Sequence, residues 1–395
     1  MKKLMVLFIV VLVGFVFTAS ALPDWKETVK SKIMSTQLPD RSEKKEFEVK
    51  PGGKLIIDLE TGGGIEIKGW DKNVLSAEAS NDGDEIEFNF EMNGNEVTIS
   101  SEYTDDDDSH SSDSKLVVFL PKIFDVDFST MGGGVDISYV EGKLEGHTMG
   151  GGLHLSNLKG YLNITTMGGS IKLKDSEVDG RVHTMGGEVL VENVKGDVNA
   201  SSMGGQVRHI NVTGNDKSVG NEVDISTMGG DLDIDRAPNG AKLKTMGGDV
   251  TINYAGKYLN AETMGGNISA KEVDGWIKAK TMGGDVDIKM IGNPNADDRD
   301  VNISSMGGDI TLAVPDGLSM DIDIEIVYTK DNHHKDFEDC KIISDFKVNE
   351  ERTTEWKKKN SGTARKYIYG KGIVNGGKNK IKIRTINGSV NLKKG

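Results

Sequence analysis

The sequence predicts an all-β fold, a single-stranded parallel β-solenoid (β-helix) of about twelve 18-residue coils with capped ends. First, the tetrapeptide Thr/Ser-Met-Gly-Gly occurs ten times, and seven of the nine intervals between its methionines have the same length, as from Met149 to Met167. Second, apolar residues alternate with polar ones between these tetrapeptides, which is the period of a strand. Third, the chain has 50 glycines and one cysteine, so packing and hydrogen bonds must stabilise it without an intramolecular disulfide.

Each coil is expected to hold two short strands. Counted from the methionine, apolar residues usually fall at +4, +6, +9, +13 and +15, and Thr or Ser falls at +17. A coil of this length is too short for a strand, a helix and a return strand, so helical repeats are excluded. Coils stacked about 4.8 Å apart would place each position above its equivalent and so form continuous columns. In the coil that begins at Met149, the predicted inward residues are Leu153, Leu155, Leu158, Leu162, Ile164 and Thr166.

The Gly-Gly pair is expected to form the sharp turn between the Thr/Ser position and the next strand. The last coil has Asn387 in place of the first glycine. Because glycine and asparagine both enter the left-handed region, we expect a positive φ at this first position. Gly247→Val should then cost more stability than Gly247→Asn. The predicted turn residues are Gly132, Gly150, Gly168, Gly186, Gly204, Gly229, Gly247, Gly265, Gly283, Gly307 and Asn387.

Two further coils and two insertions complete the repeat. A degenerate coil at residues 62–67 and a closing coil at 385–392 predict a rod roughly 55–60 Å long. The crossover rule for parallel strands favours right-handed coiling. The two long intervals place insertions at residues 211–221 and 292–300, on one edge and roughly 19 Å apart. Insertions on one face can mark a working surface, but we interpret these as tolerated surface loops.

The segments outside the repeat define the domain organisation. Lys2 and Lys3, an apolar run at 4–17 and a small-residue site ending at Ala21 predict a cleaved signal peptide. The apolar run has 14 residues, short of the roughly 20 that cross a bilayer, so no transmembrane segment is expected in the mature chain. The predicted divisions are residues 1–21 (signal peptide), 22–45 (N-terminal linker or capping segment), 46–128 (first coil and longer-strand opening region), 129–314 (regular stack) and 315–395 (irregular C-terminal region and closing coil).

Composition and spacing argue against several kinds of site. The formal net charge of −14 provides no basic footprint for nucleic acid. Aspartates that follow Gly-Gly, such as Asp249, lack the spacing of the calcium-binding nonapeptide, and Ser170 and Glu188 stand at the same position. His147 and His183 would lie two coils, roughly 10 Å, apart, too far to share a metal ion. We therefore assign no catalytic residue, metal ligand or cofactor.

The methionines of the ten repeats are the candidate binding stripe. If the strand alternation continues past Thr166, the next side chain points outward, and the ten together form an apolar stripe suited to contacts. If the chain turns at the methionine, the side chain instead packs into a corner of the core. We favour the corner, because exposed methionines in an exported protein would be open to oxidation. The ten residues are Met131, Met149, Met167, Met185, Met203, Met228, Met246, Met264, Met282 and Met306.

Several segments resemble bacterial exported proteins described as putative adhesins with β-strand repeats. They are residues 47–55 (FEVKPGGKL), 62–71 (GGGIEIKGWD), 116–122 (LVVFLPK) and 380–388 (KIKIRTING), together with the recurrent TMGGDV. The likeness spans roughly residues 45–395. The resemblance implies a β-solenoid at the cell envelope and offers no catalytic residues to transfer, and a shared fold does not fix function.

The sequence favours a non-catalytic exported protein of the bacterial cell envelope, an adhesin-like structural or binding protein with an unidentified protein or glycan partner. It is expected in the periplasm, at the cell surface or outside the cell. One alternative is a periplasmic scaffold or envelope-stress component that binds a protein partner. The other is a polysaccharide-active β-helix enzyme, which would need clustered carboxylates in a cleft walled by long loops. Minimal coils and scarce aromatic platforms count against that alternative.

Overall fold

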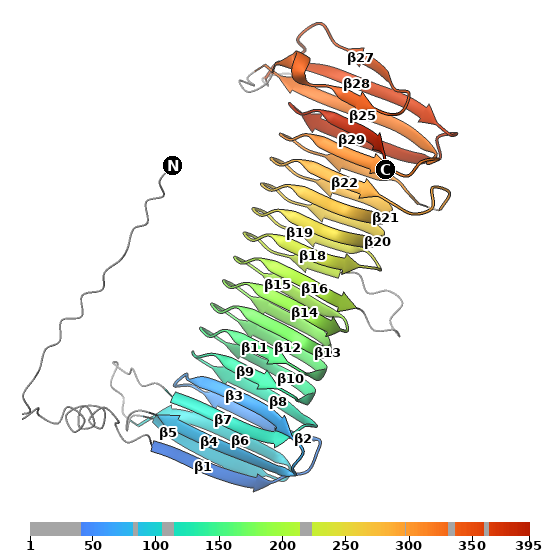
Figure 1. Ribbon diagram of the computed structural model, residues 1–395. Coiled ribbons are helices and arrows are strands. Elements are labelled where there is room, and N and C mark those ends of the chain that lie inside the picture. The colour runs from blue at the N-terminus through green and yellow to red at the C-terminus, as the bar shows by residue number, and fades with distance from the viewer. Residues whose placement is uncertain are drawn as a thin grey trace, which may run out of the picture.

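The protein is all-β throughout the part of the chain that the structure describes (Figure 1). This computed structural model places 30 strands in one partly parallel sheet, with no α-helix among the described residues. None of these residues belongs to a helix with the length and apolar character of a membrane span. The predicted signal peptide lies outside them. The described residues are 41–81, 86–104, 114–213, 223–296, 298–330, 336–358 and 363–395.

Eight strands form the opening region. They are β1 (Arg41–Glu48), β2 (Gly53–Leu59), β3 (Gly64–Trp70), β4 (Val74–Asn81), β5 (Ile86–Asn93), β6 (Glu96–Tyr103), β7 (Ser114–Pro121) and β8 (Phe124–Thr130). Strand β2 pairs in parallel with β8, and β3 pairs in parallel with the first strand of the regular stack that follows. Antiparallel pairs β1–β4, β4–β7 and β5–β6 lie beyond them and close this end. The opening region therefore contains both parallel and antiparallel strand pairs, because antiparallel strands extend both faces past the first parallel coil.

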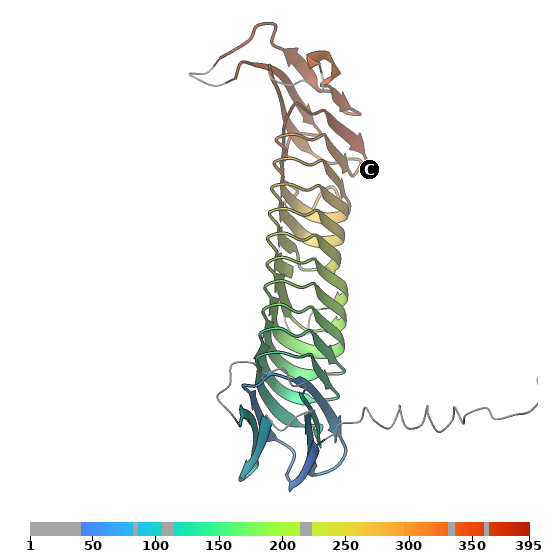
Figure 2. The ribbon, with the colours of Figure 1, turned by 90° about the vertical axis from the view of Figure 1, so that its left-hand side faces the viewer.

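The regular stack follows, and each coil adds one strand to each of two faces. Its strands are β9 (Val135–Ser138), β10 (Glu141–Thr148), β11 (Leu153–Ser156), β12 (Lys159–Thr166), β13 (Ile171–Thr184), β14 (Val189–Lys195), β15 (Val198–Ser202), β16 (Val207–Thr213), β17 (Val223–Ser226), β18 (Leu232–Ala237), β19 (Ala241–Lys244), β20 (Val250–Glu262), β21 (Ile268–Lys280), β22 (Val286–Met290), β23 (Val301–Ser304) and β24 (Ile310–Val314). Pairing is parallel, and equivalent residues of successive coils are register partners, as in Leu153 with Ile171. Figure 2 views the stack from the side of the Met-Gly-Gly turns.

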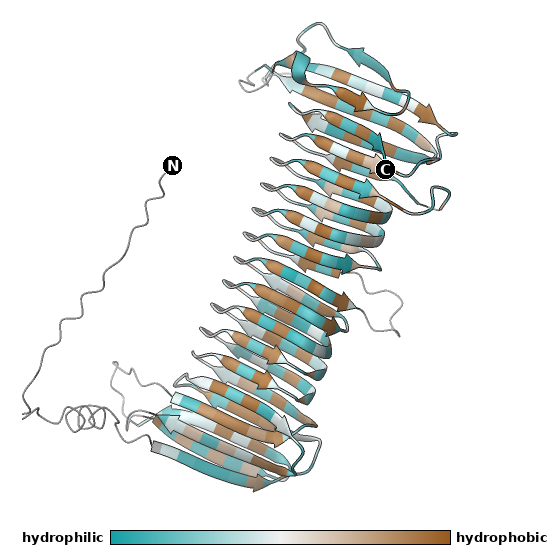
Figure 3. Ribbon diagram, in the orientation of Figure 1, coloured by the Kyte–Doolittle hydropathy of each residue, from teal (hydrophilic) through white to brown (hydrophobic). Residues whose placement is uncertain are grey.

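The inward residues form the predicted core. Leu153, Leu155, Leu158, Leu162 and Ile164 are each no more than 1% exposed. The alternation of apolar and polar residues along the strands is visible in Figure 3. Because every coil repeats this pattern in register, one apolar cluster runs from the opening region to the final strands. The expectation of continuous apolar columns is confirmed.

A column of buried hydroxyls runs beside the apolar core. The Thr245 hydroxyl donates to the carbonyl oxygen of Gly230 in the preceding coil at 2.9 Å. The Thr245 hydroxyl oxygen also accepts the N–H of Gly248, two residues beyond the methionine, at 3.2 Å. Each hydroxyl thus satisfies one donor and one acceptor at the turns of two neighbouring coils. The same pair of hydrogen bonds recurs at Thr166, Thr184, Ser202, Thr227, Thr263, Thr281 and Ser305.

The prediction of a positive φ at the first glycine is wrong. Of the twenty glycines in the ten repeats, only Gly133, a second glycine, has a positive φ, at 84°. The second position needs glycine for a different reason, which is the close approach of the next coil. A Cβ on Gly248 would lie 2.2 Å from the carbonyl oxygen of Gly230, whereas the nearest atom to a Cβ on Gly247 is 3.2 Å away.

Asn387 misled the turn prediction because its environment differs from that of the ten repeats. Its φ is 58°, and its side-chain oxygen accepts the N–H of Thr329 at 2.8 Å. In the first five regular coils the left-handed residues other than glycine instead occupy position +8, at the other turn. There φ is 49–59° at Tyr139, Asn157, Asp175, Asn193 and Asn211.

The C-terminal region closes the other end of the stack. Its elements are β25 (Met320–Thr329), the 3-10 turn η1 (Phe337–Asp339), β26 (Ile342–Ser344), β27 (Asn349–Arg352), β28 (Arg365–Val374), β29 (Asn379–Ile386) and β30 (Val390–Lys394). Strands β29 and β30 stack directly on β23 and β24 as the last coil. The strands between β24 and β29 lie beyond that coil, where β25 and β28 pair antiparallel and β27 extends the face. The last coil is therefore covered by the segment that precedes it in sequence.

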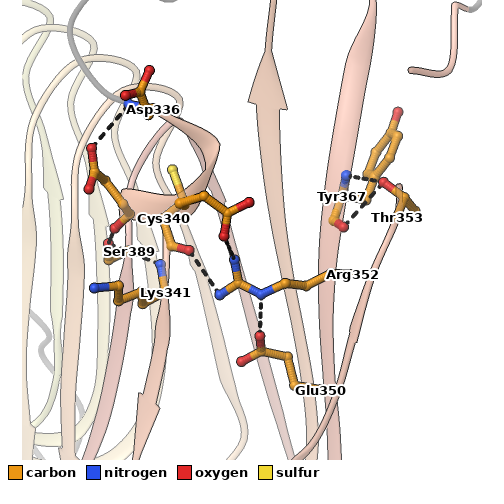
Figure 4. A network of polar contacts seen from close by, with 10 residues as sticks. Asp336, Cys340, Lys341, Glu350, Arg352, Thr353, Tyr367 and Ser389 are labelled. Carbon is orange, nitrogen blue, oxygen red and sulfur yellow. Dashed lines mark hydrogen bonds and ion pairs between the residues drawn. The ribbon is translucent and has the colours of Figure 1, made fainter. Parts of the chain in front are cut away.

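A polar network ties this covering segment together (Figure 4). The Arg352 side chain donates to the Glu350 carboxylate at 2.6 Å and to the Cys340 carbonyl oxygen at 3.3 Å. Ser389, in the last coil, accepts the N–H of Lys341 through its hydroxyl at 3.3 Å. The Lys341–Ser389 contact fixes the covering segment to the coil beneath it.

One histidine lies inside the apolar core. His209 stands at +6, between Val191 and Ile234 in register, and is 2% exposed. Neither ring nitrogen has a hydrogen-bond partner among the described residues. Burial without a counter-charge lowers the pKa of His209 from 6.5 to about 4.

The first prediction tests the register of the columns. Ile164 is fully buried and pairs with Val182, whereas its neighbour Asn163 is exposed. We expect Ile164→Asp to cost more than about 4 kcal/mol of unfolding free energy, because it buries an unpaired charge. Asn163→Asp should change it by no more than about 0.5 kcal/mol. Thermal unfolding of both variants measures this, and equal melting temperatures would contradict the register.

The second prediction tests the close approach at the turn. Gly248→Ala should cost at least about 2 kcal/mol, because the new methyl group overlaps a backbone carbonyl of the preceding coil. The matched control Gly247→Ala should cost about half as much or less, since its methyl group has more room. Urea unfolding compares the two, and a larger loss for the Gly247 variant would refute the steric explanation.

The third prediction concerns acid stability. The folded-state pKa of His209 lies below 6.5, so its contribution to stability is complete above pH 6.5 and is lost as the pH falls toward about 4. A shift of that size corresponds to a loss of about 3 kcal/mol. We expect the His209→Leu variant to lose less stability on acidification than the unaltered protein. Melting temperatures of both proteins at pH 7 and pH 4.5 measure this difference. Parallel pH dependence in both proteins would show that His209 does not titrate as proposed.

Candidate functional site

The ten repeat methionines point outward. Their exposed fractions range from 39% at Met203 to 58% at Met131, so the favoured corner placement is wrong. Strand β12 ends at Thr166, and the N–H of Met167 continues its hydrogen bonding by donating to the Thr148 carbonyl oxygen at 3.1 Å. Since Thr166 faces inward, the next side chain must face solvent before the chain turns at the glycines. We call the ten residues the methionine ridge.

The surroundings of the methionine ridge leave it open. On one side are the Gly-Gly pairs, which carry no side chains. On the other side is the outward column two residues before each methionine. In the first five coils this column holds Ser129, His147, Thr165, His183 and Ser201. In its first half the ridge is thus a row of flexible thioethers bordered by bare backbone and by small polar or imidazole side chains, whereas Lys244, Glu262 and Lys280 stand in the bordering column of the second half.

Both histidines of the neighbouring column are held by serine hydroxyls. His183 Nδ1 lies 2.8 Å from Ser201 Oγ, and His147 Nε2 lies 3.4 Å from Ser129 Oγ. Partial burial and then the nearby Arg181 lower the pKa of His183 below 6.5. The His183 imidazole is therefore neutral at pH 7 and keeps a lone pair for a hydrogen bond or a metal ion.

The aspartates that follow Gly-Gly form a ladder between coils. The Asp231 carboxylate accepts the N–H of Asp249 at 2.8 Å, and the Asp249 carboxylate accepts the N–H of Asn267 at 2.6 Å. Asp285 and Asp309 repeat the contact at 2.7 Å. Each of these carboxylates thus accepts a backbone hydrogen bond from the neighbouring coil.

Over the described ranges, no group of three or more His, Cys, Asp or Glu side chains is placed to hold a metal ion.

A groove of about 460 Å³ lies beside the insertion at 292–300. Tyr258 and Trp276, both at +12, stack across its wall with ring centroids 4.7 Å apart and planes 9° from parallel. Arg299 of the insertion is 2% exposed, donates to the Ile291 carbonyl oxygen at 2.6 Å and pairs with Asp274 at 2.5 Å. The insertion is therefore anchored to the stack. Its counterpart at 211–221 falls mostly outside the described residues, so the expected separation of the two insertions stays a prediction.

Neither stacked ring was predicted from the sequence. Tyr258 and Trp276 are one repeat apart in the sequence, which places them in equivalent positions of adjacent coils. The repeat that predicted the core columns could have found this pair if it had been applied to outward positions. The asparagine ladder at +8 was missed in the same way. There Asn193 donates to Asp175 and Asn211 donates to Asn193, each at 2.9 Å.

Comparisons with known proteins add structural likeness alone. No protein-family model and no curated protein matches the chain. A putative cell adhesion protein from Clostridium sporogenes is similar at 10% identity and a TM-score of 0.21, over 90% of this chain and 100% of that one. A putative adhesin from Bacteroides fragilis is 17% identical with a TM-score of 0.31, over 69% and 97% of the two chains.

A third solved structure has a different title. It is a putative lipid binding protein from Parabacteroides distasonis, 14% identical with a TM-score of 0.32, over 69% of this chain and 97% of its own. Of the three structures, one is titled a putative adhesin and one a putative cell adhesion protein. At these identities and TM-scores the likenesses transfer no ligand and no activity to this chain.

The fourth prediction tests the exposure of the methionine ridge. Mild peroxide should convert the ten ridge methionines to sulfoxides while the fold persists, because their side chains already contact solvent. Met290 and Met320, at 1% and 0% exposure, are internal controls that should stay reduced. Peptide mass spectrometry measures both groups. Oxidation of the controls at the rate of the ridge would contradict this assignment of inward and outward positions.

Proposed function

We propose that the chain is a non-catalytic exported β-solenoid that serves as an adhesin-like structural and binding protein of the bacterial cell envelope. In this proposal residues 1–21 direct export, and the mature chain forms a single-stranded, right-handed stack of about twelve coils. Its length comes from repetition, and its binding surface comes from outward columns that repeat with the coils.

The observation that carries this proposal is the methionine ridge. Ten flexible apolar side chains, each at least 39% exposed, follow one another on successive coils. Contiguous exposed apolar side chains on a soluble protein mark a contact surface. Methionine suits such a surface because its unbranched side chain adapts to the shape of a partner.

The groove beside residues 292–300 supports binding without chemistry. Its Asp274 carboxylate is paired with the buried Arg299, so it is not a free general acid or base. The stacked Tyr258 and Trp276 nonetheless favour a glycan as a second class of partner, since aromatic rings provide amphipathic contact area. The groove thus favours a binding role over the enzyme hypothesis.

Fractionation of cells that express the full chain tests export and location. We expect a mature protein that begins at residue 22, and we expect protease added to intact cells to digest it. A matched control that lacks residues 2–17 should stay in the cytoplasm, uncut. Mature protein that resists the protease on intact cells but is cut after the outer layer is opened would support the periplasmic scaffold instead. Retention of the full chain in the cytoplasm would refute the proposal.

Binding of the purified mature chain to isolated cell envelopes tests the role of the ridge. A variant in which glutamine replaces Met149, Met167 and Met185 at once removes apolar character from three adjacent coils. This variant should bind envelopes more weakly. The same substitution with leucine keeps the apolar character and should retain envelope binding. Equal binding by the glutamine variant and the unaltered protein would show that the ridge is not the contact surface.

A further inference from the structure

The ten positions of the methionine ridge have a sulfur atom in common as well as apolar character. All ten exposed positions carry methionine, whereas the buried +4 column varies freely among Val, Leu and Ile, as at Val135, Leu153 and Ile171. In the last coil the equivalent residue is Ile386, which pairs with Val327 and is half-buried. Leucine or isoleucine would build an equally apolar ridge and would resist oxidation. The thioether group is therefore what the ten exposed positions of the ridge share beyond apolar character.

The stacking distance lets neighbouring thioethers converge. Successive ridge residues are about 4.8 Å apart along the stack, as in any parallel ladder. Methionine has three rotatable side-chain bonds, so sulfur atoms from two or three adjacent coils can turn toward one point. The Gly-Gly pairs beside the ridge place no side chain in the way. Soft thioether sulfur is a ligand that selects Cu(I) over hard ions such as Ca²⁺ and Mg²⁺.

Two imidazoles border the ridge in its first half. His147 and Met149 flank the buried Thr148 and so face the same side, as do His183 and Met185. Residues two apart on a strand are roughly 6.6 Å apart, within reach of both side chains. The Ser201 hydroxyl contacts His183 Nδ1 at 2.8 Å. A hydrogen bond of this kind at one ring nitrogen orients the other toward a metal ion.

We propose that the first half of the methionine ridge, from Met131 to Met203, binds Cu(I) at two separate sites, each formed by methionine sulfur together with one imidazole, that of His147 or that of His183. The inference deepens the proposed function, because it names a ligand for the ridge that the proposed function treats as a contact surface. Binding here requires no redox step, since the ion enters and leaves in one oxidation state. The half from Met228 to Met306 offers thioethers without histidines and binds the ion more weakly.

Anaerobic titration of the purified mature chain with Cu(I), against a chromophoric Cu(I) chelator, tests the proposal. We expect the protein to take Cu(I) from the chelator. Replacing Met149, Met167 and Met185 with leucine should weaken binding by more than about tenfold, because leucine keeps the bulk and loses the sulfur. Leucine at Met246, Met264 and Met282 is the matched control and should leave the tighter sites unchanged. His147→Ala with His183→Ala should also weaken binding.

Ag(I), a soft ion that does not change oxidation state here, gives a second readout. Methionine methyl signals in NMR spectra should shift in the first half of the ridge at the lowest Ag(I) ratios, while the fold and melting temperature persist. Affinity for Cu(I) that is unchanged in the first leucine variant, or absent in the unaltered protein, would overturn the proposal.

The two ridge substitutions separate this proposal from the proposed function. The first leucine variant should lose Cu(I) and still bind envelopes, whereas the glutamine variant should lose both. Loss of Cu(I) without loss of envelope binding supports both proposals. Cu(I) binding by a protein that does not bind envelopes refutes the contact surface and leaves the metal site standing.

Discussion

Neighbouring coils are joined where a buried hydroxyl lies between two glycine backbones. The hydroxyl accepts the N–H of the second glycine in its own repeat and donates to the carbonyl oxygen of the second glycine in the preceding repeat, as Thr245 does with Gly248 and Gly230. The contact brings the backbones so close that the second position has no room for a Cβ. Because Thr245 is buried and both glycines are partly buried, the hydroxyl satisfies backbone groups that have restricted access to water.

The exposed surface follows from this contact. With the Thr or Ser held inward and the glycines held against the preceding coil, the methionine between them faces solvent. Its column repeats on every regular coil, so a feature set by backbone hydrogen bonds becomes a ridge along the stack.

The two ends of the stack need a different kind of pairing, because an open stack presents unpaired strand edges. Antiparallel strands β1, β4 and β5 at one end, and β27 and β28 at the other, continue the faces past the last parallel coil.

The sequence predicted what the repeat determines directly. The inward columns were found because a constant repeat length stacks equivalent residues in register. The turn was misassigned because a glycine required for a positive φ and a glycine required for close approach look the same in sequence, and Asn387 belongs to a different environment. The outward methionines could not be assigned from alternation alone, since a turn at that residue would reverse them. Strands β25 to β28 belong to no repeat in the sequence, so their position over the last coil was not predictable.

The most direct test of this account removes one hydroxyl from the column. Thr245→Val keeps the shape of the side chain and takes away the oxygen that Gly248 and Gly230 share. The account predicts a loss of about 1–3 kcal/mol in the free energy of unfolding, measured by urea denaturation. Thr245→Ser keeps the hydroxyl and should lose less than half as much. A valine variant as stable as the unaltered protein, or more stable than the serine variant, would contradict the claim that the hydroxyl column holds the coils together.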